Sequence, residues 1–176
     1  MPKHRARLIF RLKRYDKQWR KNKIFTGYQC FNRIFGLETN FTESNKDFWT
    51  GFETALRKND WILLDVVAGE VKYDNDLIGW INNQKKNGLV EKIKTDDRNR
   101  AAEINNSYKM IDEITFKSTV DTYLIAYAEA NNLGIFTREN HRKNMAELYK
   151  IPDVCDLLKI KRIKKPKIFL QEIGFN

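Results

Sequence analysis

The stretch STVDTYLIAYAEANNLGIFTREN, residues 118 to 140, contains in one run the local structures that decide the fold. Its first half has apolar residues at helical spacing, Gly134 is a stop signal, and a short apolar run ends in polar residues. We expect a helix over residues 119–132, a strand over 134–137 and then a polar loop. In α/β folds, functional groups gather beyond the carboxyl ends of such strands.

The same alternation continues on both sides of this stretch. Upstream, we expect a helix over 47–58, a strand in DWILL (60–64), a helix from Asp65 through VVAGEVK (66–72), a helix in DLIGWINNQKKNG (76–88) and one or two polar amphipathic helices in 91–117. Downstream, we expect a short helix in DVCDLL (153–158), a strand in KIKRI (159–163) and a helical turn in KIFLQEIGF (167–175). Strands that alternate with helices predict an α/β fold with a mostly parallel sheet between two helical layers.

Length and composition favour one cytoplasmic domain spanning residues 1–176. The chain is 41% hydrophobic, enough for one packed core, and has no apolar run long enough to span a membrane or to act as a secretion signal. Cys30 and Cys155 are too few and too far apart for a disulfide framework or a zinc ribbon.

Positive charge is concentrated near the two ends of the chain. Residues 1–33 hold eleven Lys and Arg against Asp16 alone, with aromatic residues interleaved, and six more cations lie in 159–167. Such clusters are either solvated surface or a grip for a polyanion such as RNA, in which aromatics stack on bases. The nucleic-acid-binding residues we predict are Arg11, Lys13, Arg14, Arg20, Lys21, Lys23, Arg138 and Arg142.

Two carboxylates are expected on apolar faces. Asp121 precedes Leu124 and Ile125 by three and four residues at a helix start, although its spacing from Ser118 also fits a capping box. Glu70 follows Val66 and Val67, so a helix through 65–72 directs its side chain among valines. Burying an ionised carboxylate is costly unless a cation compensates it.

Two further acids follow the strand at 134–137. Glu139 lies at its carboxyl end, and Asp153 lies at the start of the next helix, as either a cap or a ligand. Glu70, Asp121 and Glu139, with Asp153 nearby, offer the hard oxygen ligands that Mg²⁺ or Mn²⁺ prefers. We therefore predict a metal site in which Glu70, Asp121 and Glu139 are the catalytic carboxylates.

The run from Val120 to Asn140, followed by KIPDVCDLL (150–158), resembles the C-terminal half of the PIN-domain nucleases. The similar branch is a little-characterised bacterial one related to the VapC-type toxins. FWTGFETAL (48–56) and GEVKYDNDLIGWI (69–81) extend the resemblance over residues 46–160, leaving 1–45 as a diverged basic and aromatic segment. The resemblance implies a three-layer α/β/α sandwich and metal-dependent cleavage of RNA.

The start of the chain departs from that family's pattern. The family begins with an apolar strand running into D-[TSA]-[NS]-x-[LIF]-I, whose Asp is the first metal ligand. If RLIF (7–10) matches the end of this motif, His4 or a neighbour replaces the Asp and the first strand is truncated.

Two functions follow from the resemblance, and a third is open. The first is a PIN-type ribonuclease, a hydrolase acting as the toxin of a toxin–antitoxin pair, with RNA, a cognate antitoxin and a second copy as partners. The second is a catalytically impaired domain that binds RNA or a protein partner. A purely structural interaction protein would explain the fold and the charge but not Glu70 among valines.

Overall fold

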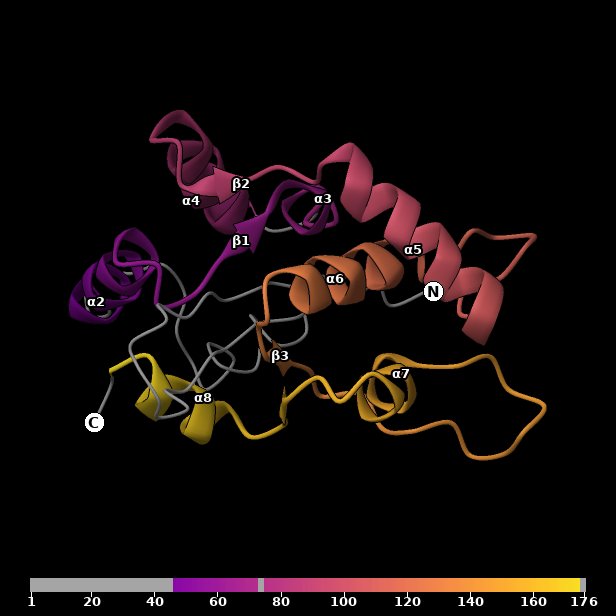
Figure 1. The fold of residues 1–176 in the computed structure, drawn as a ribbon. Coiled ribbons are helices and arrows are strands. Elements are labelled where there is room, and N and C mark those ends of the chain that lie inside the picture. The colour runs from indigo at the N-terminus through magenta and orange to yellow at the C-terminus, as the bar shows by residue number, and fades with distance from the viewer. Residues whose placement is uncertain (1–45, 73–74, 175–176) are drawn as a thin grey trace.

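The computed structural model describes residues 46–72 and 75–174, in which helices alternate with short strands (Figure 1). The upstream elements are α2 (Lys46–Arg57), β1 (Leu63–Leu64), α3 (Asp65–Ala68), α4 (Asn75–Lys86), β2 (Val90–Glu91) and α5 (Thr95–Tyr108). The downstream elements are α6 (Thr119–Ala130), β3 (Ile135–Phe136), α7 (Ile151–Leu157), β4 (Arg162–Ile163) and α8 (Pro166–Glu172). The predicted mixed α/β class is confirmed.

The described strands form two separate parallel pairs. Leu63 pairs with Val90 between β1 and β2, and Ile135 pairs with Arg162 between β3 and β4. The expected single central sheet is therefore not seen among the described residues. The predicted truncation of the first strand concerns residues outside them.

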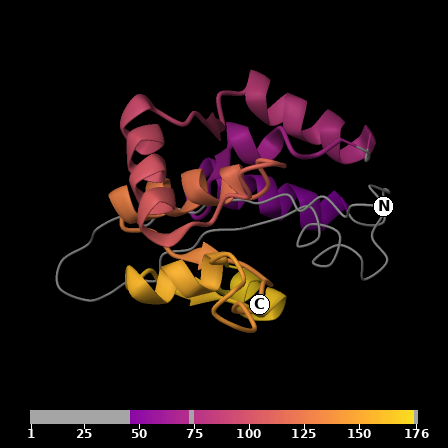
Figure 2. The same ribbon diagram turned by 90° about the vertical axis from the view of Figure 1, so that its right-hand side faces the viewer.

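Helix α6 is the centre of the fold. Seven of its residues are buried, from Asp121 to Ala128, because its sequence is apolar on nearly every side. Both views place α6 between α5 on one side and β3 with α7 on the other (Figures 1 and 2). Much of the stretch that decides the fold is thus enclosed by other elements.

One continuous apolar core joins the upstream and downstream elements. Upstream, Phe52 packs on Trp61 with ring centroids 4.2 Å apart, and Trp61 Nε1 donates to the Phe52 carbonyl at 2.9 Å. Downstream, the Phe136 and Phe169 rings lie 5.1 Å apart. Both residues of β1 and both of β3 are fully buried, as expected for strands covered on two faces.

Three predicted elements differ from the structure. The helix from Asp65 ends at Ala68, because the amides of Glu70 and Val71 bond three residues back to Val67 and Ala68 in successive turns. Strand β2 was not predicted, and residues 109–118, most of which were expected to be helical, form a loop after α5. The helices at 47–58, 76–88 and 119–132 are confirmed to within a few residues.

Within residues 46–72 and 75–174, none of the helices combines the length and the apolar character needed to cross a bilayer.

Candidate functional site

The carboxyl ends of β3 and β4 meet at one edge, and the polar loop after β3 begins there. The Thr137 amide donates to the Ile163 carbonyl at 3.0 Å, which extends the pairing one residue past β3. Thr137 is buried, and its Oγ1 accepts the Glu139 amide at 3.1 Å. This turn carries the chain away from the strand toward the start of α7.

Glu139 lies against the first turn of α7. Its Oε2 accepts the amide of Ile151 at 3.4 Å. A carboxylate is stabilised there, because the first amides of a helix have no partner within it and carry a partial positive charge. The predicted ligand Glu139 therefore has a local structural role at a helix N-terminus.

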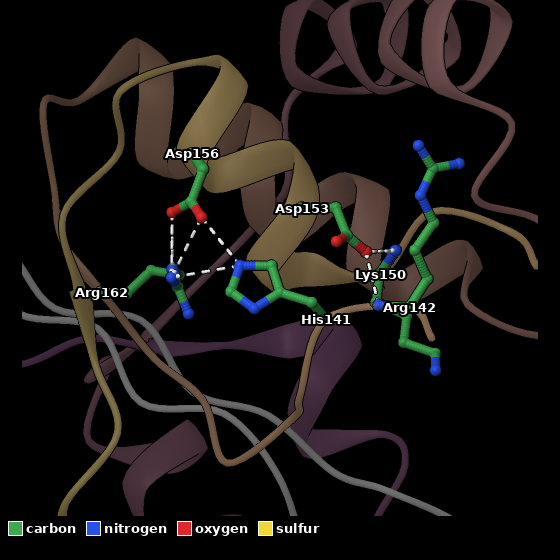
Figure 3. A network of polar contacts seen from close by, with 6 residues as sticks. All are labelled: His141, Arg142, Lys150, Asp153, Asp156 and Arg162. Atoms are coloured by element: carbon green, nitrogen blue, oxygen red, sulfur yellow. Dashed lines mark hydrogen bonds and ion pairs between the residues drawn. The ribbon is translucent and has the colours of Figure 1, made fainter. Parts of the chain in front are cut away.

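Asp153 fixes both the start of α7 and the loop before it (Figure 3). Its Oδ2 accepts the Lys150 amide at 2.9 Å and the Arg142 amide at 3.2 Å. The cap interpretation of Asp153 accounts for this oxygen. The same oxygen also sets the position of the Arg142 backbone.

Arg142 is stacked on an aromatic pair. Its guanidinium carbon lies 3.6 Å from the Tyr149 ring centroid, and the Tyr149 ring lies 5.8 Å from that of Tyr108. The Tyr149 amide donates to the Lys109 carbonyl at 3.3 Å. The predicted nucleic-acid contact Arg142 is thus held in a defined orientation, while Arg138 is exposed.

A second polar network joins the same loop to α7 and β4 (Figure 3). His141 Nε2 lies 2.8 Å from Asp156 Oδ2, and Arg162 donates to both Asp156 oxygens at 3.0 and 3.2 Å. The hydrogen bond with His141, and then the Arg162 charge, hold the pKa of the Asp156 carboxyl below its usual range. Sequence spacing gives no signal for this network, since His141 and Arg162 are 21 residues apart.

Lys164, the residue after β4, reaches across the edge to the polar loop. Its Nζ donates to Asn140 Oδ1 at 2.7 Å. Lys159 and Lys161 precede β4 and lie toward the opposite end of the strand, where Lys161 pairs with Glu172 at 3.4 Å. The C-terminal cationic cluster is therefore divided between two ends of β4.

Glu70 and Asp121 come from two other segments of the chain. Glu70 follows α3 in a turn, so it is not carried on a helix as the sequence suggested, and its Oε2 is buried. Asp121, 1% exposed, is in the first turn of α6. Ser118 has a left-handed φ of 71° and makes no capping bond through its side chain.

The predicted metal site would need several ligand side chains close together. Among residues 46–72 and 75–174, no three His, Cys, Asp or Glu side chains are grouped as a metal ion requires. Glu139 and Asp153 are bonded to backbone amides, and Cys155 is a buried thiol whose pKa is raised by burial. The described residues thus contain no such group, and the Mg²⁺ or Mn²⁺ site stays a prediction.

Six of the eight predicted nucleic-acid contacts lie near the N-terminus, outside the described residues: Arg11, Lys13, Arg14, Arg20, Lys21 and Lys23.

Comparison with known proteins identifies one family. Neither the curated proteins nor the solved structures contain a match to this chain. One family model, described as a domain of unknown function (DUF4411), matches residues 35–174. The match spans 140 of the 176 residues and includes every element described above. This chain is therefore a member of the DUF4411 family.

Proposed function

We propose that this domain binds RNA along the edge formed by the carboxyl ends of β3 and β4. We call this surface the basic edge and define it by five cations: Arg138, Arg142, Lys164, Lys165 and Lys167. Four of them are exposed and Arg142 is half-buried under its stacking contact. Phosphate groups of RNA are the natural partners of such a surface.

The observation that carries this proposal is the bond from Lys164 Nζ to Asn140 Oδ1 at 2.7 Å. It joins the segment after β4 to the segment after β3, which are 24 residues apart in sequence. Because the two strands are parallel, Arg138 and Lys164 both follow strand ends at this edge. Cations from two segments are thereby gathered on one surface.

The stacked Arg142 adds a site suited to a nucleobase. A guanidinium plane fixed on Tyr149 keeps its orientation without losing its charge. Single-stranded nucleic acids are bound by cations that follow the backbone and by flat groups on which bases stack. The Arg142–Tyr149 pair combines both properties, and Asp153 holds the Arg142 backbone in place.

The finer architecture is part of the proposal. We place both strand pairs in one parallel sheet of a PIN-like three-layer sandwich. Support comes from the parallel direction of both pairs and from the full burial of β1 and β3, which is typical of strands covered by helices on both faces.

Fluorescence polarisation with a labelled 20-nucleotide mixed-sequence RNA tests the basic edge. We expect affinity to fall steeply between 50 and 200 mM salt, and Lys164→Glu/Lys165→Glu to reduce the log–log salt slope by about 1.4, at about 0.7 per phosphate contact on a single strand. The matched control is Lys85→Glu/Lys86→Glu, which makes the same charge change in the last turn of α4. Equal losses in both variants would show that net charge, not the basic edge, governs binding.

Metal-dependent cleavage of RNA is the second candidate function, and one short stretch of sequence supports it. The match begins at Phe35 and includes Leu37–Glu38–Thr39–Asn40, outside the described residues. Acid-Thr-Asn is the order of the expected first-ligand motif, with Glu in place of Asp. In this proposal Glu38 takes the place of the first ligand, in preference to the alignment on RLIF.

In this second function, Glu38, Glu70, Asp121 and Glu139 would together hold Mg²⁺ or Mn²⁺, which activates water for attack on a phosphodiester. The domain would then act as the toxin of a pair neutralised by a cognate antitoxin. The test is manganese-dependent cleavage of a mixed RNA by the full chain, Glu38→Gln and Asp121→Asn. Cleavage lost in both variants supports a nuclease, and cleavage unchanged in both removes these carboxylates from the site.

A further inference from the structure

The loop after β3 is held against α7 through two neighbouring residues, His141 and Arg142 (Figure 3). Two carboxylates of α7, three residues apart and therefore on one face of the helix, hold them. Asp156 contacts the His141 ring, and Asp153 accepts the Arg142 amide. Residues 138–142 belong to no helix or strand, so their conformation depends on such contacts.

The His141 ring is bonded to an ion pair that joins α7 to β4. Its Nε2 lies 2.8 Å from Asp156 Oδ2, and Arg162 donates to both Asp156 oxygens at 3.0 and 3.2 Å. An ionised carboxylate only accepts hydrogen bonds, so Nε2 carries a proton and donates it to Asp156. One imidazole thus ties the loop to a helix and a strand together.

His141 also stands between the two contacts that hold cations on the basic edge. On one side of it, Asn140 Oδ1 accepts Lys164 Nζ at 2.7 Å. On the other side, the Arg142 guanidinium carbon lies 3.6 Å from the Tyr149 ring centroid. Because His141 is bonded to both neighbours through the backbone, fixing its side chain restricts both contacts.

The ion pair that holds His141 adds no net charge to this surface, because Asp156 and Arg162 are opposite in sign. The contact is also open to solvent, since the side chains of His141 and Asp156 are 50% and 53% exposed. Contacts as exposed as this contribute little to the stability of the whole fold. Its effect is therefore local, on the order of the loop.

We infer that His141 is a positioning residue of the basic edge, which holds residues 138–142 in the conformation that binds RNA. This inference rests on the RNA-binding function proposed above. A loop already fixed in its bound conformation loses less conformational freedom on binding, so the affinity is higher. His141 acts through Asn140 and Arg142, without contacting RNA itself.

Fluorescence polarisation with the same labelled RNA tests this role. His141→Ala should lower RNA affinity about threefold, a loss typical of one exposed polar contact. His141→Gln should retain most of the wild-type affinity, because the glutamine Nε2 can donate to Asp156 in place of the imidazole.

A variant with unchanged net charge separates positioning from direct contact. Asp156→Asn/Arg162→Gln removes one acid and one base, and it should also lower affinity about threefold. Adding His141→Ala to this variant should cause no further loss, since the anchor is already broken. The matched control is Lys161→Gln/Glu172→Gln, the same charge change in the pair at the opposite end of β4, which should bind RNA as the wild type does.

Hydrogen exchange of the free chain gives a measurement that needs no RNA. The Arg142 amide, bonded to Asp153, should exchange about threefold faster in His141→Ala than in the wild type, because the loop opens more often. The Thr137 amide, bonded to the Ile163 carbonyl, should exchange at an unchanged rate, which shows that the strands stay paired.

Three outcomes would overturn the inference. They are wild-type RNA affinity in His141→Ala, unchanged exchange of the Arg142 amide, or a further loss when His141→Ala is added to Asp156→Asn/Arg162→Gln, which would place His141 in direct contact with RNA. A wild-type chain that does not bind RNA would remove the proposed function and this inference together. RNA binding combined with any of the three outcomes would remove the inference alone.

Discussion

Residues 46–133 and residues 134–174 share a core but differ in charge. The first region has 12 Lys and Arg against 15 Asp and Glu, a net charge of −3, whereas the second has 10 against 5, a net charge of +5. Yet residues of both regions pack into one apolar cluster. Burial and surface charge are therefore set independently in this chain, and the proposed binding function is confined to the smaller, basic region.

Both regions also contain an aspartate that caps a helix, but the two aspartates differ in what else they bind. Asp97 accepts the Lys94 amide at 2.9 Å at the start of α5, as Asp153 accepts the Lys150 amide at the start of α7. Of these two capping carboxylates, Asp153 also holds a loop amide, that of Arg142. Asp97 therefore only caps its helix, whereas Asp153 also positions the backbone of a cation.

The largest expected effect tests whether the common core makes the two regions one cooperative unit. Phe136→Ala in β3 and Trp61→Ala before β1 should each lower the free energy of unfolding by about 3–5 kcal/mol, because both side chains are fully buried. Urea unfolding followed by circular dichroism should show one transition in each variant. Phe116→Ala, the same change as Phe136→Ala at an exposed position, should alter stability by no more than about 0.5 kcal/mol. Two separate transitions in either core variant would show that the regions fold independently.

A smaller effect distinguishes the two capping carboxylates. Asp97→Ala and Asp153→Ala should each cost about 1 kcal/mol of stability, since each removes a helix cap. Asp153→Ala should also lower RNA affinity about fivefold, equivalent to one lost hydrogen bond of about 1 kcal/mol, because Arg142 loses its backbone anchor. Removing a negative charge alone would raise RNA affinity. A rise in fluorescence polarisation titrations would thus show that Asp153 does not position Arg142.

The smallest effect concerns Asp156, which is 53% exposed and therefore well screened by solvent. Its folded-state pKa is lowered, so its stabilising contribution is present above the ordinary aspartate value of about 3.9 and is lost as pH falls through the lowered pKa. Asp156→Asn should be less stable than the wild type by under about 1 kcal/mol at pH 6. This difference should shrink steadily as the pH is lowered below about 4 in urea titrations. Asp96→Asn, on α5 in the acidic region, gives the background, and a difference that does not shrink with falling pH would rule out a role for the Asp156 charge.

The sequence was most informative where the signal was local. The apolar spacing from Val120 to Ala128 and the stop at Gly134 predicted α6 and β3, because helix periodicity and glycine act within a few residues. β2 was missed because Val90–Glu91 is too short to show a strand pattern. The helix through Glu70 was predicted too long, because the valines fitted helical spacing, whereas the amides of Glu70 and Val71 bond three residues back.

The candidate site was less predictable because its contacts join distant residues. Arg138 and Arg142 were named among the predicted nucleic-acid contacts, and both follow β3 in the structure. The contacts of Arg142 with Tyr149, of His141 with Asp156 and of Lys164 with Asn140 depend on how the loop after β3 returns to α7 and β4. The spacing of residues along the sequence does not predict where such a loop comes back to the fold. The metal-site grouping of Glu70, Asp121 and Glu139 stays a prediction.

Cys155 lies in α7, the helix that Asp153 caps. Its side chain is fully buried, and burial raises the pKa of its thiol. A thiol in that state reacts with alkylating reagents only when the surrounding packing opens, because the thiolate is the reactive form and the side chain is enclosed. In a Cys30→Ser background, the rate of Cys155 alkylation therefore measures how often α7 separates from its neighbours. Comparing that rate with and without RNA would show whether occupying the basic edge slows the opening of the helix behind it.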